Sequence, residues 1–214
     1  PTYLADLDPL LDAMRLLKSA AEVAQMQAAC DISVTAHKRA MSVCKVGMNE
    51  YHLAAEVHHQ FAVQGSARVA YGSIVAGGDN ACILHYTNND QPLQDSDLVL
   101  IDAGCELDHY AADITRTFPV NGRFTAPQKA IYELVLAAHQ AALGVIKPGA
   151  PFSAMQDAAV AVMTQGLLDL GLLEGTLENN IDEQSYRQYY MHNIGHWLGM
   201  DVHDVGVYKI DGES

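Results

Sequence analysis

Hydrophobic residues recur with a helical period in four stretches of the chain, and each stretch opens on a residue that can cap a helix. Glycine or proline follows most of these stretches and ends the pattern. The predicted helices run over about 19–39, 49–64, 125–145 and 153–170, with caps at Ser19, Asn49, Thr125 and Ser153. The apolar residues expected to face the core from the first helix are Val23, Met26, Cys30 and Val34.

Between the second and third helices, shorter apolar runs separated by turn residues predict hairpins. One hairpin is expected from strands at about 70–75 and 81–85, joined by Gly77-Gly78-Asp79-Asn80. The next contains the apolar run Leu98–Ile101 and the strand that follows it. The chain therefore alternates between helices and hairpins.

Composition predicts one principal globular domain. The chain has 214 residues, of which 50% are hydrophobic and 18% charged, so it can bury a sizeable core and is unlike a disordered polyelectrolyte. Its net charge of −14 disfavours binding to nucleic acid or to an anionic membrane surface, because an acidic protein releases no counterions there.

The chain also shows no sign of export. Its four cysteines, Cys30, Cys44, Cys82 and Cys105, include no closely spaced pair, and acidic residues interrupt any apolar stretch at the N-terminus. No apolar run approaches the roughly 20 residues that cross a bilayer. We therefore expect a cytoplasmic protein without a membrane span.

Two aspartates, Asp102 and Asp113, stand at mirror positions about a predicted tight turn. If Leu107 and Asp108 form the tip of a two-residue hairpin, Asp102 lies directly opposite Asp113, with Cβ atoms about 5 Å apart. Like charges in that position are destabilising unless a carboxylate is protonated or a cation lies between them. The alternative is a solvated hairpin whose acidic residues face water.

A histidine-rich segment downstream favours the cation. His192, His196 and His203 alternate with Gly195, Gly199 and Gly206, which allow a close approach of the backbone. The spacing of His192 and His196 is similar to that of the two-histidine zinc helix, but Asn193 stands where that motif has a glutamate. Carboxylates together with imidazoles form a usable set of metal ligands.

Five motifs, in order along nearly the whole chain from about Asp12, closely resemble those of the bacterial aminopeptidase P family. They are Ser73-Ile74-Val75, Cys82-Ile83-Leu84-His85-Tyr86-Thr87, the segment 97–105 around Asp102, the segment 113–122 around Asp113, and the segment 196–206, which contains His-Trp-Leu-Gly and His-Asp-Val-Gly. The resemblance implies an α+β pita-bread fold, an antiparallel sheet covered by helices. It also implies release of the N-terminal residue from peptides with proline in second position.

Matched motif by motif, the resemblance implies two divalent metal ions, typically manganese. Asp102 would bind one metal, Asp113 would bridge both, and His196 would be the histidine ligand. His85 resembles the active-site histidine that contacts substrate and assists proton movement. His192 and His203 resemble the pair that lines the substrate pocket and steadies the reaction intermediate.

The chain departs from the family pattern at its ends. The family's two glutamate ligands follow the His-Asp-Val-Gly motif, but Asp211 and Glu213 match neither, so the 214-residue chain is expected to be inactive alone. Residues 1–18 resemble a linker that follows a separate N-terminal domain, and 19–214 a truncated catalytic domain. The family's catalytic domain continues with further strands after the His-Asp-Val-Gly motif. Without them an edge of the sheet would be exposed, which favours a homo-oligomer.

Two further functions remain open from the sequence. Prolidase and methionine aminopeptidase share the fold and the metal ligands, although the spelling around Trp197 and Asp102 fits aminopeptidase P better. The other alternative is a pita-bread domain that only binds its ligand and has no catalytic activity, and the presence of Asp102, Asp113 and His196 argues against it.

Overall fold

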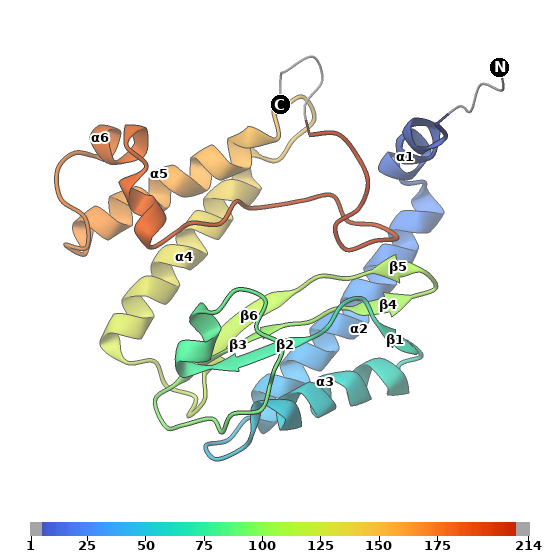
Figure 1. Ribbon diagram of the computed structural model, residues 1–214, viewed down its shortest axis with the longest axis horizontal. Coiled ribbons are helices and arrows are strands. Elements are labelled where there is room, and N and C mark those ends of the chain that lie inside the picture. Colours follow the sequence, from blue (N-terminus) through green and yellow to red (C-terminus); the bar gives the residue numbers. More distant parts are fainter. Residues whose placement is uncertain (1–5, 209–214) are drawn as a thin grey trace. The chain divides into compact units, whose positions relative to one another are not determined.

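The structure is a computed structural model that describes residues 6–208 (Figure 1). Its described residues form two compact units. The first contains residues 6–124 and 196–206, and the second contains 125–195 with 207 and 208. The described strands all lie in the first unit.

Three helices lead into the first unit: α1 (Asp8–Leu16), α2 (Ala20–Val43) and α3 (Glu50–Val63). The predicted capping box starts α2, because the Ser19 hydroxyl accepts from the Glu22 backbone N–H and the Glu22 carboxylate accepts from the Ser19 N–H. The helix extends to Val43, about one turn beyond its predicted end. Helix α3 follows Asn49 as expected.

The predicted core face of α2 is right only in part, because Cys30 packs partly buried against the core but the fully buried positions lie elsewhere on the helix. Val23 is 54% exposed and Val34 38%, whereas the buried residues of the helix are Ala29, Ile32, Ser33, Ala36, His37 and Ala40. Small side chains let the backbone of α2 approach the strands closely, and such a face carries little hydrophobic signal. Two polar residues on that face are buried because each bonds to a strand backbone: Ser33 accepts from the Cys105 N–H, and His37 donates from Nε2 to the Ala103 carbonyl.

The strands form two small antiparallel sheets, which Figure 1 shows above α3 in its view. One has the order β2-β3-β6 and the other β1-β4-β5. Their bounds are β1 Arg68–Val69, β2 Ile74–Gly77, β3 Leu98–Asp102, β4 Cys105–Leu107, β5 Tyr110–Ala111 and β6 Thr115–Pro119. Val99 and Ile101 of β3 are fully buried in a core shared with α2 and α3.

The aspartate hairpin forms, but its predicted register is wrong by one residue at the tip. Asp108 and His109 occupy the turn with φ of 45° and 72°, so Leu107 pairs with Tyr110 and Asp102 pairs with Thr115. Two left-handed residues are what a type I′ turn requires, and its twist matches that of the strands. Asp113 is therefore two residues away from the position opposite Asp102.

The predicted hairpin of 70–75 with 81–85 is also wrong. Strand β2 pairs with β3 instead, and the chain turns directly after Gly77 into a 3₁₀ helix, η1 (Gly78–Cys82). Gly78 has φ of +54°, which leaves the extended conformation. Ile83 and Leu84 are more than half exposed, so the apolar run that suggested a strand contributes little to the core.

The second unit is helical, with α4 (Ala126–Val145), α5 (Ser153–Asp169), α6 (Leu177–Asp182) and the 3₁₀ helix η2 (Ser185–Gln188). Thr125 caps α4 as predicted. Ser153 does not cap α5, because it is already the first helical residue and Phe152 holds the cap position without a side-chain bond. None of the described helices is long and apolar enough to cross a membrane.

We expect Gly104→Ala to destabilise the chain strongly. A Cβ at Gly104 would lie 1.6 Å from the Ala112 carbonyl oxygen, which belongs to the backbone and cannot rotate away. The expected loss in the free energy of unfolding is about 3 kcal/mol or more. Urea denaturation measures it. Gly144→Ala is the control, because nothing lies near that position in α4 and alanine favours a helix; equal stability of the two variants would contradict the prediction.

Candidate metal centre

Asp102 and Asp113 lie on one face of the hairpin. Asp102 pairs with Thr115, and Asp113 precedes Thr115 by two residues, so its side chain projects to the same side. The two aspartates are diagonal neighbours rather than a directly opposed pair. The predicted shared face of the two aspartates is therefore confirmed although the register was wrong, because shifting the pairing by two residues leaves a side chain on the same face of a strand.

Tyr71 joins the two carboxylates. Its hydroxyl oxygen lies 2.5 Å from Oδ1 of Asp102 and 3.0 Å from Oδ1 of Asp113. A phenol has one proton to donate, so it satisfies one of these oxygens at a time. Burial raises the pKa of Tyr71, and both carboxylates raise it further, so the hydroxyl keeps its proton. Burial likewise raises the pKa of Asp102; the charge of Asp113 adds to this, while the bond from Tyr71 opposes it.

His196 approaches the same carboxylate pair from the segment 196–206. Its Nδ1 lies 2.9 Å from the Trp197 carbonyl oxygen, which can only accept, so Nδ1 carries a proton. Its Nε2 lies 3.0 Å from Oδ2 of Asp113. On a neutral ring, Nε2 and Oδ2 are both acceptors, and a proton or a metal cation must lie between them. A backbone carbonyl that fixes the imidazole through its other nitrogen is the usual support of a metal-binding histidine.

His203 lies against His196, with ring centroids 4.3 Å apart in an edge-to-face arrangement. His85 lies in an exposed turn after η1, with φ of 55°. His192 belongs to the second unit, where its exposed ring lies 2.8 Å from the Asn193 carbonyl oxygen. The structure thus brings Asp102, Asp113, His196 and His203 together within the first unit.

The donor chemistry of this cluster fits a divalent cation, since it combines two carboxylates with an imidazole held by its other nitrogen. Across residues 6–208, however, no three or more His, Cys, Asp or Glu side chains gather into a group that could hold a metal ion. The cluster supplies only part of a set of metal ligands, and the Tyr71 hydroxyl lies within hydrogen-bond distance of one oxygen of each aspartate.

A buried ion network holds the segment that carries His196 and His203. The Asp204 side chain is 1% exposed and accepts from Arg15 Nη2 at 2.5 Å and from Lys18 Nζ at 3.0 Å. Its backbone N–H donates to the Trp197 carbonyl, which closes the segment into a loop. Burial opposes ionisation of Asp204, but the bonds from Lys18 and Arg15 outweigh it, and the pKa lies below its usual value.

Sequence reasoning missed Tyr71, Arg15 and Lys18. Tyr71 lies in a stretch predicted as a strand, where one aromatic residue attracts no notice. Lys18 and Asp204 are 186 residues apart, and an isolated charge carries no information about so distant a partner. Asp204 itself could have been found, since it directly follows His203 in a matched motif.

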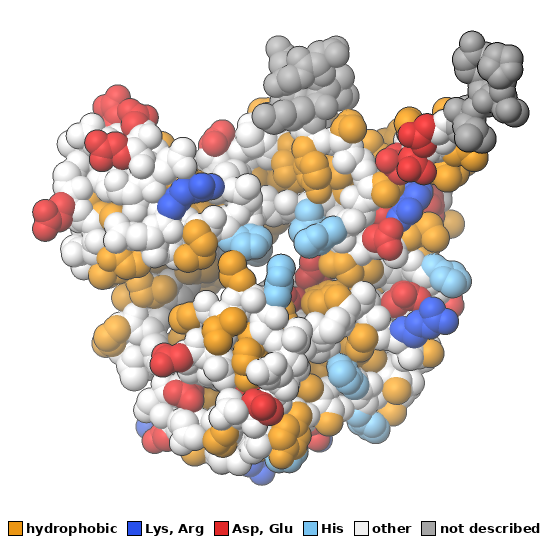
Figure 2. All heavy atoms as spheres, in the orientation of Figure 1, with side chains coloured by type: hydrophobic (Ala, Val, Ile, Leu, Met, Phe, Trp, Pro, Cys, Tyr) orange, Lys and Arg blue, Asp and Glu red, His pale blue; other side chains and the backbone are white. Residues whose placement is uncertain are grey.

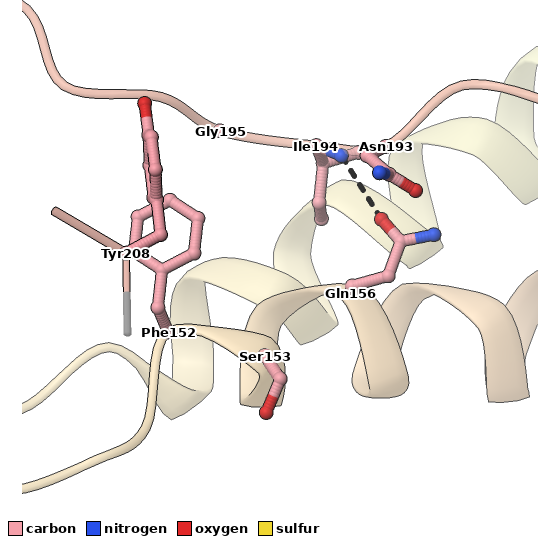
Figure 3. Close-up of a pocket in the computed structure, with 7 residues that line it drawn as sticks. All are labelled: Phe152, Ser153, Gln156, Asn193, Ile194, Gly195 and Tyr208. Atoms are coloured by element: carbon pink, nitrogen blue, oxygen red, sulfur yellow. Dashed lines mark hydrogen bonds between the residues drawn. The ribbon is translucent and has the colours of Figure 1, made fainter. Parts of the chain in front are cut away.

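The second unit contains a separate pocket of about 410 Å³ (Figure 3). It lies between the start of α5 and the segment 193–195, where Gln156 Oε1 accepts from the Ile194 N–H at 2.9 Å. The rings of Phe152 and Tyr208 meet edge to face beside it. None of the six predicted site residues lines this pocket.

The chain is similar to known proteins along nearly its whole length. The model of metallopeptidase family M24 matches residues 24–213. A protein of Haemophilus influenzae named Xaa-Pro aminopeptidase is 51% identical over 97% of this chain and 48% of its own length. The structure of aminopeptidase PepP from Pseudomonas aeruginosa has a TM-score of 0.96 and 57% identity, covering 97% of this chain and 47% of that one.

Zinc-substituted aminopeptidase P of Escherichia coli, in complex with product, is also similar, with a TM-score of 0.97 and 46% identity over 100% of this chain and 49% of that one. These similarities confirm the predicted α+β pita-bread fold, with its helices and antiparallel sheets. The chain spans about half the length of the relatives it matches.

We expect Asp204→Asn to lower the free energy of unfolding by about 3 kcal/mol at pH 7, because it leaves two cations beside a buried neutral group. The folded pKa of Asp204 is depressed, so its contribution is present above the unfolded pKa of about 4 and is lost as pH falls through the folded value. Denaturation from pH 7 to 2 tests this. Asp201→Asn, at a side chain 65% exposed, should change stability by less than about 0.5 kcal/mol. A constant difference across the pH range would refute it.

Proposed function

Because this chain belongs to metallopeptidase family M24, we propose that it forms part of a metal-dependent aminopeptidase that removes the N-terminal residue before proline. The relatives that cover nearly the whole chain bear the name Xaa-Pro aminopeptidase. The observation that carries the proposal is the cluster of Asp102, Asp113 and His196 on one face of the aspartate hairpin. The activity proposed is that of the whole protein.

In the whole protein, Asp102, Asp113 and His196 would be three of the residues that hold two divalent ions, and Asp113 would serve both. Manganese is proposed because the ligands are mainly carboxylate oxygens, with a single imidazole, whereas structural zinc sites favour thiolates and more imidazoles. When bound, the ions would act as Lewis acids toward the scissile carbonyl. His196 contributes its Nε2 lone pair, which the bond from Nδ1 to the Trp197 carbonyl aims toward Asp113.

The remaining histidines would act on the peptide. His203, exposed and stacked edge to face on His196, is placed to bond a substrate oxygen beside the carboxylates. His85 would contact substrate and assist proton movement from its exposed turn. His192, by the resemblance to the family, would also contact the peptide and steady the reaction intermediate. An imidazole suits these roles because it can donate or accept a proton near neutral pH.

We further propose a cytoplasmic protein that assembles as a homo-oligomer and binds neither nucleic acid nor membranes. The net charge of −14 supports the last part, and acidic side chains are spread over the face shown in Figure 2. An acidic surface repels the phosphates of nucleic acid and of anionic lipids.

In the full-length protein, Asp113→Ala should abolish turnover, lowering kcat by about a thousandfold or more, because loss of metal-ion catalysis costs several kcal/mol. Bound metal, measured by mass spectrometry of the purified protein, should fall in parallel. Asp157→Ala removes the same charge from an exposed position of α5 and should leave both unchanged. Normal activity with full metal content in Asp113→Ala would refute the ligand assignment.

The full-length protein should also prefer proline in the second position. Proline lacks a backbone N–H and has a fixed φ, so a pocket can select it by shape without supplying an acceptor for that group. We expect kcat/KM for an Xaa-Pro peptide to exceed that for the matching Xaa-Ala peptide by at least about tenfold. Equal values would exclude selectivity for proline and favour another peptidase of the same fold.

A further inference from the structure

Glu50, the first residue of α3, is a buried carboxylate to which the proposed function gives no role. It is 0% exposed. Its Oε1 accepts from the Gly77 N–H at 2.8 Å and from Asn80 Nδ2 at 3.0 Å. Its Oε2 accepts from the Tyr86 hydroxyl at 2.8 Å and from the Gln91 N–H at 3.0 Å. Four donors replace the water that the carboxylate loses on burial.

These donors come from both limbs of one segment, residues 77–91. Gly77 and Asn80 lie where the segment leaves β2, and Tyr86 and Gln91 lie where it returns to α3. The Glu50 N–H also donates to the Gln91 carbonyl, so the returning limb makes three hydrogen bonds with Glu50, two of them through Gln91. The carboxylate therefore fixes the two limbs relative to each other, and His85 lies between them.

A second tether holds the same segment against β2. The Asn89 side chain accepts from the Val75 N–H and donates to the Ser73 carbonyl, both at 2.8 Å. It thereby takes the place of a neighbouring strand along the outer edge of β2. The Tyr86 ring is buried against Ile74 and Ala76 of the same region.

His85 depends on these neighbours for its position. Its backbone adopts the left-handed conformation, with φ of 55°, which is unfavourable for a residue with a Cβ. Such a conformation persists only where the surrounding structure imposes it. The adjacent Tyr86, bonded to Glu50 and buried by its ring, is the nearest fixed point.

We propose that Glu50 is a positioning residue that sets the place of His85 for the reaction by tying together both limbs of the segment 77–91. The proposal rests on the role given to His85 in the proposed function. An amide at this position would present one acceptor oxygen and one NH₂ group. In either orientation the NH₂ group would meet a backbone N–H, that of Gly77 or that of Gln91, and one limb would be released.

Hydrogen exchange by mass spectrometry on the full-length protein tests the structural half. Glu50→Gln should speed exchange in peptides covering 77–91 by about tenfold or more, with strands β3 and β6 unchanged. Glu56→Gln, on the same helix and in a partly exposed pair with Arg39, is the control and should leave 77–91 unchanged. Unaltered exchange in Glu50→Gln, or equal acceleration throughout the protein, would overturn the proposal.

Kinetics test the half that concerns His85. Glu50→Gln should lower kcat by about tenfold to a hundredfold, with KM and metal content little changed, as expected for a group that orients a reacting residue. In a His85→Ala background, the same substitution should have little further effect. If Glu50→Gln lowers kcat as much in the His85→Ala background as it does alone, the positioning role of Glu50 is overturned and the role of His85 stands. If His85→Ala is itself fully active, the proposed role of His85 is overturned as well.

If Glu50→Gln does not fold, Tyr86→Phe provides the same comparison, because it removes one of the four donors and leaves the carboxylate bonded to three. Its effect on exchange should centre on the returning limb near Gln91, and its effect on kcat should again disappear in the His85→Ala background. Additive losses in that background would overturn the proposal.

Discussion

The break in the hairpin between Asp102 and Cys105 is the constraint on which the rest of the first unit depends. Gly104 passes so close to the Ala112 carbonyl that no side chain fits between them. The pairing continues on both sides of the break, yet β3 and β4 belong to different sheets. The hairpin can therefore bend from one sheet into the other while keeping its register, and it presents Asp102 and Asp113 on one face at the bend.

Helix α2 is shaped by that break. Half of its six buried residues are alanine, which lets the helix lie near the strands. The same face places Ser33 and His37 at the backbone groups that the bend exposes. A face of larger apolar residues would hold the helix farther away and leave those groups unsatisfied. Packing and hydrogen bonding thus act together to fix the strand that ends in Asp102.

Two buried acidic groups in this unit are satisfied in different ways. Asp204 has two cations within reach, and its pKa falls below the usual value despite burial. Glu50 relies on four neutral donors. Asp102 and Asp113 share one phenolic proton, and burial raises the pKa of Asp102. Among these carboxylates, the aspartate pair is the one whose geometry favours an added cation.

Local sequence was enough to predict the helices that follow Ser19, Asn49 and Thr125, the apolar strand before Asp102, the motifs of the family and the shared face of the aspartates. These features follow from local chemistry or from a period of two along a strand, and an error in turn position did not change them. Contacts between distant segments fixed which face of α2 is buried, which strand pairs with β2, and the partners of Tyr71, Asp204 and Glu50. Those outcomes depend on close approach between segments far apart in the chain, and a polar or small residue carries no local sign of what it will meet.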